Sequence, residues 1–369
     1  MRLAKITVQD FRNIGLAELL FAGRRQFLAG ENGQGKSNLL EAAGLVTALR
    51  SFRTSDDRAM IAHGKAEAAV ACGFEHEKFG AARVVIRLRA GGKEVQWDGE
   101  RVPRLGEFLG RFPAVVFSSQ DQQFVRGAPG GRRRWLDLVL SATDADYLRE
   151  LQDYHRALAG RNALLKRGAA DAGELEAFEQ PLARAAAEVS RRRAAGVSCL
   201  GGYVAEAYAR MAGGGEAAGL AHAPGVAGGA ELDAAGWAAV FARGRARDAM
   251  MRATLGGPHR DDCALTVAGR AAREFASEGQ QRSLALALRL AEAAFLRART
   301  GVTPVLLADD VLGELDAGRR RRFWGALDGE HQVIATGTRA PDEAEEGAAA
   351  WEFFGVRGGC FTAEGRRPK

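Results

Sequence analysis

Residues 30–37 read Gly30-Glu31-Asn32-Gly33-Gln34-Gly35-Lys36-Ser37, which is the pattern G-x-x-x-x-G-K-S. Glycines in such a loop let the backbone turn its N–H groups inward toward phosphate oxygens. The lysine reaches the β- and γ-phosphates of a nucleotide, and the hydroxyl after it binds Mg²⁺. An apolar run at 27–29 and the helical spacing of apolar residues after Ser37 predict a strand before the loop and a helix after it. The sequence therefore predicts that residues 30–37 bind nucleotide phosphates and that Ser37 also binds Mg²⁺.

Two adjacent acids, Asp309 and Asp310, follow an apolar run at 305–308. This pattern is typical of a Walker B strand that runs beside a phosphate-binding loop. We expect Asp309 to hold the Mg²⁺ ion and Asp310 to orient or deprotonate the attacking water. The metal ion would compensate two like charges that otherwise raise the pKa of one carboxyl.

A possible second anion site lies at Ser277, Gly279 and Gln280, directly before a helix with a regular apolar stripe. A hydroxyl and a bare backbone at a helix N-terminus favour anion binding. One nucleotide cannot use both this site and residues 30–37 within one protomer. The alternative is that Ser277 is an ordinary helix N-cap.

Length and composition indicate one large domain with an insertion, because 369 residues exceed a comfortable single core. Residues 132–250 are helical in character, so we expect domains at 1–131, 132–250 and 251–369, with the outer two forming an α/β head. A glycine- and alanine-rich stretch at 212–230 favours a mobile loop or a degraded strand pair.

The chain is basic, with 52 lysines and arginines against 46 acids and a pI of about 9.4. This balance fits an anionic partner such as nucleic acid, or simply an arginine-rich composition. Of the arginine clusters at 132–134, 191–193 and 319–322, we expect 132–134 to contact DNA. Four separated cysteines and the lack of a long apolar run favour a soluble, cytoplasmic protein.

The order of these motifs resembles the ATP-binding-cassette head class and, more narrowly, the RecF family of bacterial recombination mediators. The most specific match is Gly257-Pro258-His259-Arg260-Asp261-Asp262, which is followed by Ala276-Ser277-Glu278-Gly279-Gln280-Gln281-Arg282. Further matching stretches are Phe11-Arg12-Asn13, Gly30 to Asn38, Ser51-Phe52-Arg53, 133–137, 161–165, 275–290 and 306–316.

The resemblance implies an α/β fold: a P-loop mixed sheet with an antiparallel β subdomain and an inserted helical arm. It implies a weak, DNA-stimulated ATPase that forms ATP-dependent homodimers on DNA at single-strand gaps and single/double-strand junctions. It further implies that the protein works with RecR and RecO, helps load recombinase, and serves DNA repair, replication restart and the SOS response.

For the site, the resemblance implies that Ser277, Gly279 and Gln280 contact the γ-phosphate bound by the other protomer. Gln120 stands at the catalytic Q-loop position, although 118–121 read Ser-Ser-Gln-Asp where Ser-Pro-Glu-Asp is expected, and Thr336 or Thr338 lies near the switch region. Asp310 replaces the usual glutamate, which suits slow hydrolysis. The alternatives are an SMC-type structural head, for which the helical insertion is short, and the ATPase subunit of a transporter.

Overall fold

The computed structural model describes residues 1–168, 171–311, 313, 315–327, 329–338 and 351–366. The chain forms two compact units, the first built from three separate segments and the second from two. The first unit contains Met1–Gln122, Glu206–Gly215 and Arg282–Lys369. The second contains Gln123–Ala205 and Glu216–Gln281. Helices α6 (Ala172–Ala212) and α9 (Glu278–Thr300) belong partly to each.

An antiparallel sheet in the first unit has the strand order β2-β1-β4-β5-β6-β7. Alternate residues of its strands, such as Ile6 and Val8 on β1, are fully buried, as expected for a sheet with one face on the core. The Asp98-Gly99 turn joins β6 to β7. The strands are β1 (Arg2–Phe11), β2 (Ile14–Leu20), β4 (Glu67–His76), β5 (Gly80–Arg89), β6 (Gly92–Trp97) and β7 (Glu100–Arg101).

The second sheet of this unit is mixed, with the order β15-β14-β3-β13-β12-β8. All neighbouring strands from β14 to β8 are parallel, and β15 is antiparallel to β14. The parallel strands therefore end at one edge, which is where open α/β sheets bind ligands. The strands are β3 (Arg25–Ala29), β8 (Ala114–Ser118), β12 (Val305–Asp309), β13 (Val333–Gly337), β14 (Glu352–Arg357) and β15 (Cys360–Arg366).

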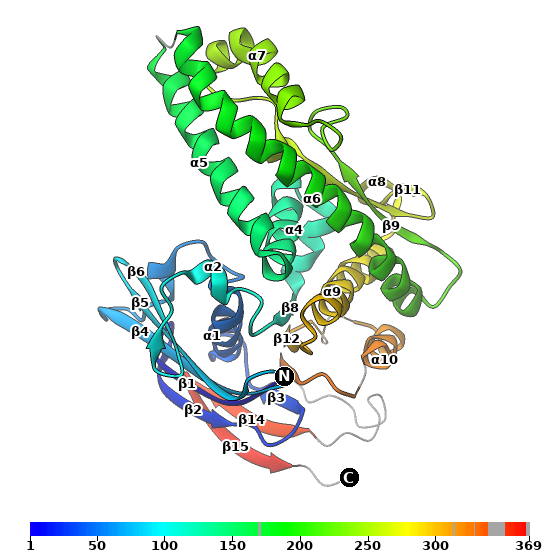
Figure 1. Cartoon of the computed structure of the whole chain (residues 1–369). Coiled ribbons are helices and arrows are strands. Elements are labelled where there is room, and N and C mark those ends of the chain that lie inside the picture. The colour runs from blue at the N-terminus through cyan, green and yellow to red at the C-terminus, as the bar shows by residue number, and fades with distance from the viewer. Residues whose placement is uncertain (169–170, 312, 314, 328, 339–350, 367–369) are drawn as a thin grey trace. The chain divides into compact units, whose positions relative to one another are not determined.

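Helix α1 (Lys36–Ala48) packs against both sheets (Figure 1), touching β1 and β4 of the first and β8 and β12 of the second. Apolar residues cover most of its circumference, as expected for a helix buried on all sides. The expected strand, loop and helix around residues 30–37 are thus confirmed. Shorter elements of this unit are η1 (Asp57–Met60), α2 (Leu105–Phe108), η2 (Ser119–Asp121) and α10 (Ala317–Ala326).

Helices dominate the second unit: α3 (Gln122–Arg126), α4 (Pro129–Thr143), α5 (Ala145–Arg167), α6 and α7 (Ala234–Met251). A small sheet in the order β11-β10-β9 joins them, formed by β9 (Ala218–Ala223), β10 (Asp262–Val267) and β11 (Arg270–Ala271). Helix α8 (Ala272–Phe275) and η3 (Pro258–Arg260) complete the unit. In the glycine-rich stretch, β9 pairs with β10 from Ala218↔Val267 to Ala223↔Asp262, so a regular strand stands where a loop or a degraded pair was expected.

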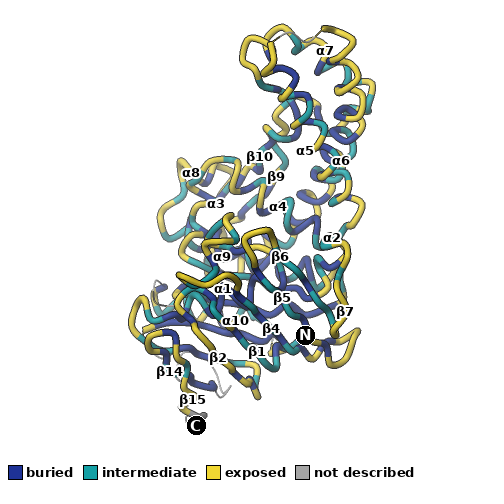
Figure 2. Tube along the Cα trace, turned by 90° about the vertical axis from the view of Figure 1, so that its left-hand side faces the viewer, coloured by how far each residue is buried: buried dark blue, intermediate teal, exposed yellow. Residues whose placement is uncertain are grey.

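Fully buried Arg161 ties α5 to α6 and α7. Its guanidinium donates to Glu179 at 2.9 Å and to Asp248 at 2.7 Å. A buried ion pair is tolerated where hydrogen bonds satisfy the charges, and removing one partner is then strongly destabilising. Exposed segments of α7 are visible in Figure 2. Within the described ranges, every helix is too short or too polar to span a bilayer.

Candidate nucleotide site

The loop at 30–35 connects the end of β3 to the start of α1, with Lys36 as the first helical residue. Gly35 has φ of 114°, a conformation that side chains rarely adopt, and a Cβ atom there would lie 2.9 Å from Asn13 Oδ1. The loop therefore depends on glycine at this point. The N-terminus of α1 carries no side-chain cap, so its first N–H groups are available to an anion.

Lys36 is buried, and its Nζ donates hydrogen bonds to Gly30 O at 2.6 Å and Glu31 O at 2.7 Å. Burial lowers the pKa of Lys36, while the nearby Asp310 and Asp309 raise it. The ammonium group thus lies inside the curl of its own loop, close to Asp309, the last residue of β12, and to Asp310 after it.

Ser37, Asp309 and Thr336 meet at the carboxyl edge of the mixed sheet. Ser37 Oγ donates to Asp309 Oδ1 at 2.6 Å, and Thr336 Oγ1 donates to the same oxygen at 3.0 Å. The register of β12 and β13 places Asp309 directly opposite Thr336. A hydroxyl and a carboxylate oxygen are ligands that Mg²⁺ accepts, and this ion usually uses one or two carboxylates together with substrate phosphates. The donor set fits Mg²⁺, and the described residues contain no group of three or more His, Cys, Asp or Glu that could hold a metal without a phosphate.

Asp310 has a left-handed backbone, with φ of 54°, and its N–H donates to Thr336 Oγ1 at 3.0 Å. Burial raises the pKa of Asp310, Lys36 lowers it and Asp309 raises it again, with a net increase. A left-handed aspartate is uncommon, and Thr336 holds its backbone in place. Thr336, a buried residue that we placed only near a switch region, therefore connects both acids of the predicted site.

Contacts around residues 30–37 involve residues that the sequence did not single out. Gln34 Oε1 accepts from Gly358 N at 2.7 Å, and Gln34 O accepts from Gly359 N at 2.8 Å. Asn13 Oδ1 accepts from Asn38 Nδ2 at 2.7 Å beside Gly35. The Gln34 side chain, expected to bind the nucleotide, thus lies on the turn between β14 and β15. A paired glycine at 358–359 was the available signal for this turn.

Arg12, whose role the sequence left open, forms a bidentate pair with fully buried Glu41 at 3.0 and 2.8 Å. Ser51 and Arg53 also donate to this carboxylate. Two of the stretches that match the RecF family, 11–13 and 51–53, therefore meet at Glu41 of α1. Their shared role in the structure is to hold α1 and its loop.

Gln120 is an exposed residue of η2, directly after β8. It makes no hydrogen bond with Ser37, Asp309 or Asp310 among the described residues. Thus the structure brings Lys36, Ser37, Asp309 and Asp310 together but does not tie Gln120 to them.

Ser277 and Gln280 cap α9 reciprocally. Ser277 N donates to Gln280 Oε1 at 2.6 Å, and Gln280 N donates to Ser277 Oγ at 3.3 Å. Ser277 is exposed, Gly279 is half-buried, and Gln280 Nε2 also donates to Glu216 at 2.7 Å. Ser277 therefore acts as the N-cap of α9, as the alternative interpretation expected. Ser277 is also exposed to solvent.

The expectation that residues 132–134 contact DNA is wrong for Arg132. This side chain is buried and forms a bidentate pair with Asp262 at 2.7 and 2.8 Å. Arg133 donates to Asp261 O, and Arg193 bridges Asp137 and Asp261. These arginines hold the 257–262 stretch, so its Gly-Pro-His-Arg-Asp-Asp run serves the packing of the second unit.

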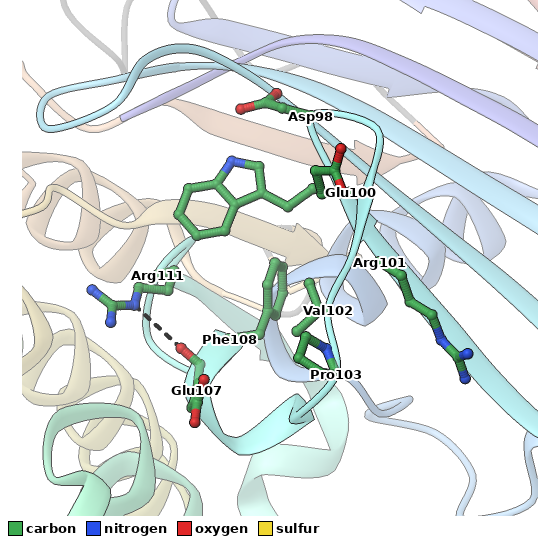
Figure 3. Close-up of a pocket in the computed structure, with 9 residues that line it drawn as sticks. Asp98, Glu100, Arg101, Val102, Pro103, Glu107, Phe108 and Arg111 are labelled. Carbon is green, nitrogen blue, oxygen red and sulfur yellow. Dashed lines mark hydrogen bonds between the residues drawn. The ribbon is translucent and has the colours of Figure 1, made fainter.

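A separate pocket of about 410 Å³ lies in the first unit beside α2, and Figure 3 shows Val102 and Phe108 on its wall. Arg111 Nε donates to Glu107 O across its rim at 3.2 Å. None of its lining residues belongs to the 30–37 loop or the Asp309–Asp310 pair, so this pocket is no part of the nucleotide site. It is lined by Trp97, Asp98, Glu100, Arg101, Val102, Pro103, Glu107, Phe108 and Arg111.

The chain combines a phosphate loop before α1, two acids at the end of β12 and a helical segment between them in the sequence. This combination defines an ABC-type ATPase head of the class found in RecF and SMC proteins. Residues 2–352 match the family described as RecF/RecN/SMC N terminal domain. The SMC head bound to the C-winged helix domain of ScpA is similar in fold alone, with 17% identity and a TM-score of 0.57 over 98% of this chain and 97% of that one.

The chain belongs to the RecF family. It is 38% identical to the "DNA replication and repair protein RecF" of Anaeromyxobacter sp. (strain Fw109-5), over 98% of this chain and 99% of that protein. It is 36% identical to the protein of the same name from Synechococcus sp. (strain JA-2-3B'a(2-13)), over 97% of each chain. A solved structure of the recombination mediator protein RecF-ATP in the RecFOR pathway is 29% identical, with a TM-score of 0.89 over 98% of this chain and 97% of that one.

Proposed function

We propose that the chain is an ATP-dependent DNA-binding protein of recombinational repair and replication restart. The observation that carries this proposal is the convergence of Lys36, Ser37 and Asp309 at the edge of the mixed sheet, with Ser37 Oγ 2.6 Å from Asp309 Oδ1. This is the arrangement that a Mg²⁺-bound nucleotide requires. The similarity to a RecF-ATP structure supports ATP as the nucleotide.

In this proposal, the backbone of Gly30, Glu31, Asn32, Gly33, Gln34 and Gly35 would surround the phosphates, with the N–H group of Gly30 held by Gly337 O. Lys36 would leave its loop carbonyls to contact the β- and γ-phosphates. Ser37 and Asp309 would hold Mg²⁺, which would neutralise phosphate charge. Exchange of the two carbonyl partners of Lys36 for phosphate oxygens strengthens its hydrogen bonds, because both groups are then charged.

Slow hydrolysis falls to Asp310, which orients and deprotonates the attacking water, with Gln120 as a second catalytic residue. A raised pKa brings the carboxyl group of Asp310 closer to the pKa range of a useful catalytic base. Thr336 fixes the backbone of Asp310 and the carboxylate of Asp309 together, so the two acids keep their relative positions.

Assembly is proposed to use Ser277, Gly279 and Gln280, which would contact the γ-phosphate held by a second copy. Exposure of the Ser277 hydroxyl at the N-terminus of α9 supports this role. ATP would then favour the homodimer because it binds the composite pocket best.

The names of the relatives support DNA, replication and repair as the setting, and the RecFOR pathway supports RecR and RecO as partners. We propose that this cytoplasmic protein binds gapped DNA as a dimer and helps load recombinase there. The divisions at 1–131, 132–250 and 251–369 would correspond to the halves of the ATPase head and the arm between them.

The proposal is tested by sedimentation of the protein with gapped DNA, with and without ATP and Mg²⁺. We expect ATP to raise the DNA-bound fraction of the natural chain and to leave that of a Lys36→Ala variant unchanged. Equal sedimentation of the natural chain in both conditions would contradict ATP-dependent DNA binding.

A further inference from the structure

The C-terminal half of α7 presents a basic face to solvent. Arg243 and Arg247 are exposed one helical turn apart, and Arg252 follows at the C-terminal cap. Met250 and Met251 lie between Arg247 and Arg252 in the chain, with 79% and 58% of their surface exposed. We call these residues the α7 basic face: Arg243, Arg247, Met250, Met251 and Arg252.

The opposite side of α7 is fixed to its neighbours, so this face is presented rigidly. Trp237 and Phe241 are buried, and Asp248 accepts from buried Arg161 at 2.7 Å. Asp248 also accepts from Leu255 N at 3.0 Å, which holds the chain directly after the helix. The arginines of the face therefore extend from a helix whose rotation is set by packing.

Charge on the α7 basic face is uncompensated. Among the described residues, the side chains of Arg243, Arg247 and Arg252 make no ion pair or hydrogen bond. Arg245 on the same helix, by contrast, pairs with Glu179 at 2.6 Å. Like charges at i and i+4 of a helix repel each other weakly, so an anion that contacts both arginines would be favoured.

The spacing suits a nucleic-acid backbone. Four helical residues rise about 6 Å, and phosphates of one DNA strand recur about every 3.4 Å along its axis. Arg243 and Arg247 can therefore reach phosphates of the same strand. Two exposed methionines add an adaptable apolar surface, and methionine is among the side chains that wedge against unstacked bases.

We infer that the α7 basic face binds DNA, with its three arginines on phosphates and its two methionines on a base that is not stacked in a duplex. This inference rests on the DNA-binding function proposed above and assigns that function a surface in the second unit. A membrane surface fits less well, because the large apolar residues Trp237 and Phe241 of this helix are buried and only the two methionines remain.

The test is fluorescence anisotropy with a labelled duplex that carries a single-stranded tail, at several salt concentrations and with ATP present. The variant is Arg243→Gln/Arg247→Gln/Arg252→Gln. The matched control is Arg149→Gln/Arg156→Gln/Arg191→Gln, which removes the same net charge from exposed arginines that already pair with Asp146, Asp153 and Glu188. Circular dichroism verifies that both variants fold.

We expect the variant to flatten the slope of log affinity against log salt by about two to three units, at roughly 0.7–0.9 for each phosphate that is no longer neutralised. The control should change the slope by less than about one unit. The assignment would be overturned if the variant had the same slope as the natural chain. It would also be overturned if the variant and the control flattened the slope equally. Failure of the natural chain itself to bind the tailed duplex would overturn the proposed function and this inference together.

A second variant, Met250→Ser/Met251→Ser, tests the base contact without changing charge. We expect it to reduce the preference for the tailed duplex over a blunt duplex by about tenfold, because partial burial of a methionine contributes on the order of that factor. An unchanged preference would contradict the methionine contact. Loss of binding to anionic lipid vesicles in the arginine variant, with DNA binding intact, would show that the face binds membranes and would overturn the inference.

Discussion

Ser37 Oγ and Asp309 Oδ1 lie 2.6 Å apart although 272 positions separate the two residues in the chain. The parallel pairing of β3 with β13 and of β13 with β12 brings them together, because all three strands end at the same edge. Thr336, at the end of the strand between them, donates to the same carboxylate. The proposed site therefore depends on the order of the strands in the mixed sheet.

Thr336→Val removes a hydroxyl that accepts from Asp310 N–H and donates to Asp309, while it keeps the side-chain volume. Loss of these partly buried hydrogen bonds should destabilise the fold by about 0.5–1.5 kcal/mol for each bond. We expect a larger loss in ATP turnover than in ATP affinity, since the positions of the acids are affected more than the phosphate loop. Urea unfolding and steady-state kinetics measure both effects, and Thr336→Ser should preserve them. Full activity in Thr336→Val would contradict this positioning role.

Gly358 and Gly359 offer a matched pair next to the phosphate loop, since both have positive φ, of 57° and 80°. A Cβ on Gly359 would lie 2.3 Å from Asn13 O, whereas a Cβ on Gly358 meets nothing within 4 Å. Gly358→Ala should therefore cost only the backbone strain of about 1–2 kcal/mol, and Gly359→Ala about 1–3 kcal/mol more. Only Gly359→Ala should also weaken ATP binding, measured by calorimetry. Equal effects of the two substitutions would show that the Asn13 contact is unimportant.

Asp310→Asn tests the proposed base. Burial raises the folded-state pKa of Asp310 above its ordinary value of 3.8, despite the opposing effect of Lys36. Ionisation of this group therefore destabilises the folded state, and the loss appears as pH rises from the unfolded-state pKa through the folded-state pKa. The variant should hydrolyse ATP at least about 100-fold more slowly and still bind ATP. Its free energy of unfolding, relative to that of the natural chain, should be higher at neutral pH than at pH 3. Single-turnover kinetics and unfolding at both pH values decide this, and a variant that hydrolyses ATP normally would exclude Asp310 as the base.

Ser277→Arg should abolish the ATP-driven change from monomer to dimer in analytical ultracentrifugation and spare ATP binding to the monomer. Because Ser277 also caps α9, the substitution costs about 1 kcal/mol of stability. Ser277→Asp separates the two roles, since aspartate keeps the cap but repels a phosphate. We expect this variant to be stable and monomeric with ATP. An ATP-independent dimer, or normal dimerisation of Ser277→Asp, would argue against a shared site.

Local sequence pattern predicted the part of the site that local structure forms. The strand, loop and helix start around residues 30–37 and the strand that ends at Asp309 each lie within one short stretch of sequence, and these elements are confirmed. The roles of their residues in binding and catalysis stay predictions. The resemblance to the RecF family is confirmed as well. By contrast, Gln34 and Gly358 are 324 positions apart, and no periodicity in either stretch indicates their contact.

The charge pattern gave a wrong prediction for Arg132. Its partner Asp262 lies 130 positions away and comes into contact only through the packing of α4 on β10. The same limit applies to β9, whose glycine and alanine residues have little strand preference of their own. Pairing with β10 makes this segment a strand. Glu314, part of the matching 306–316 stretch, lies outside the described residues.

The most direct test of whether residues 30–37 bind ATP is the affinity of Lys36→Ala for ATP in the presence of Mg²⁺, measured by calorimetry. Removal of a charge-assisted hydrogen bond to the phosphates should weaken binding by about 1.5–3 kcal/mol, which is about tenfold or more. Far-ultraviolet circular dichroism verifies the fold, and the exposed Lys78→Ala serves as a control that should bind ATP like the natural chain. A folded Lys36→Ala variant that binds ATP as tightly as the natural chain would contradict the account.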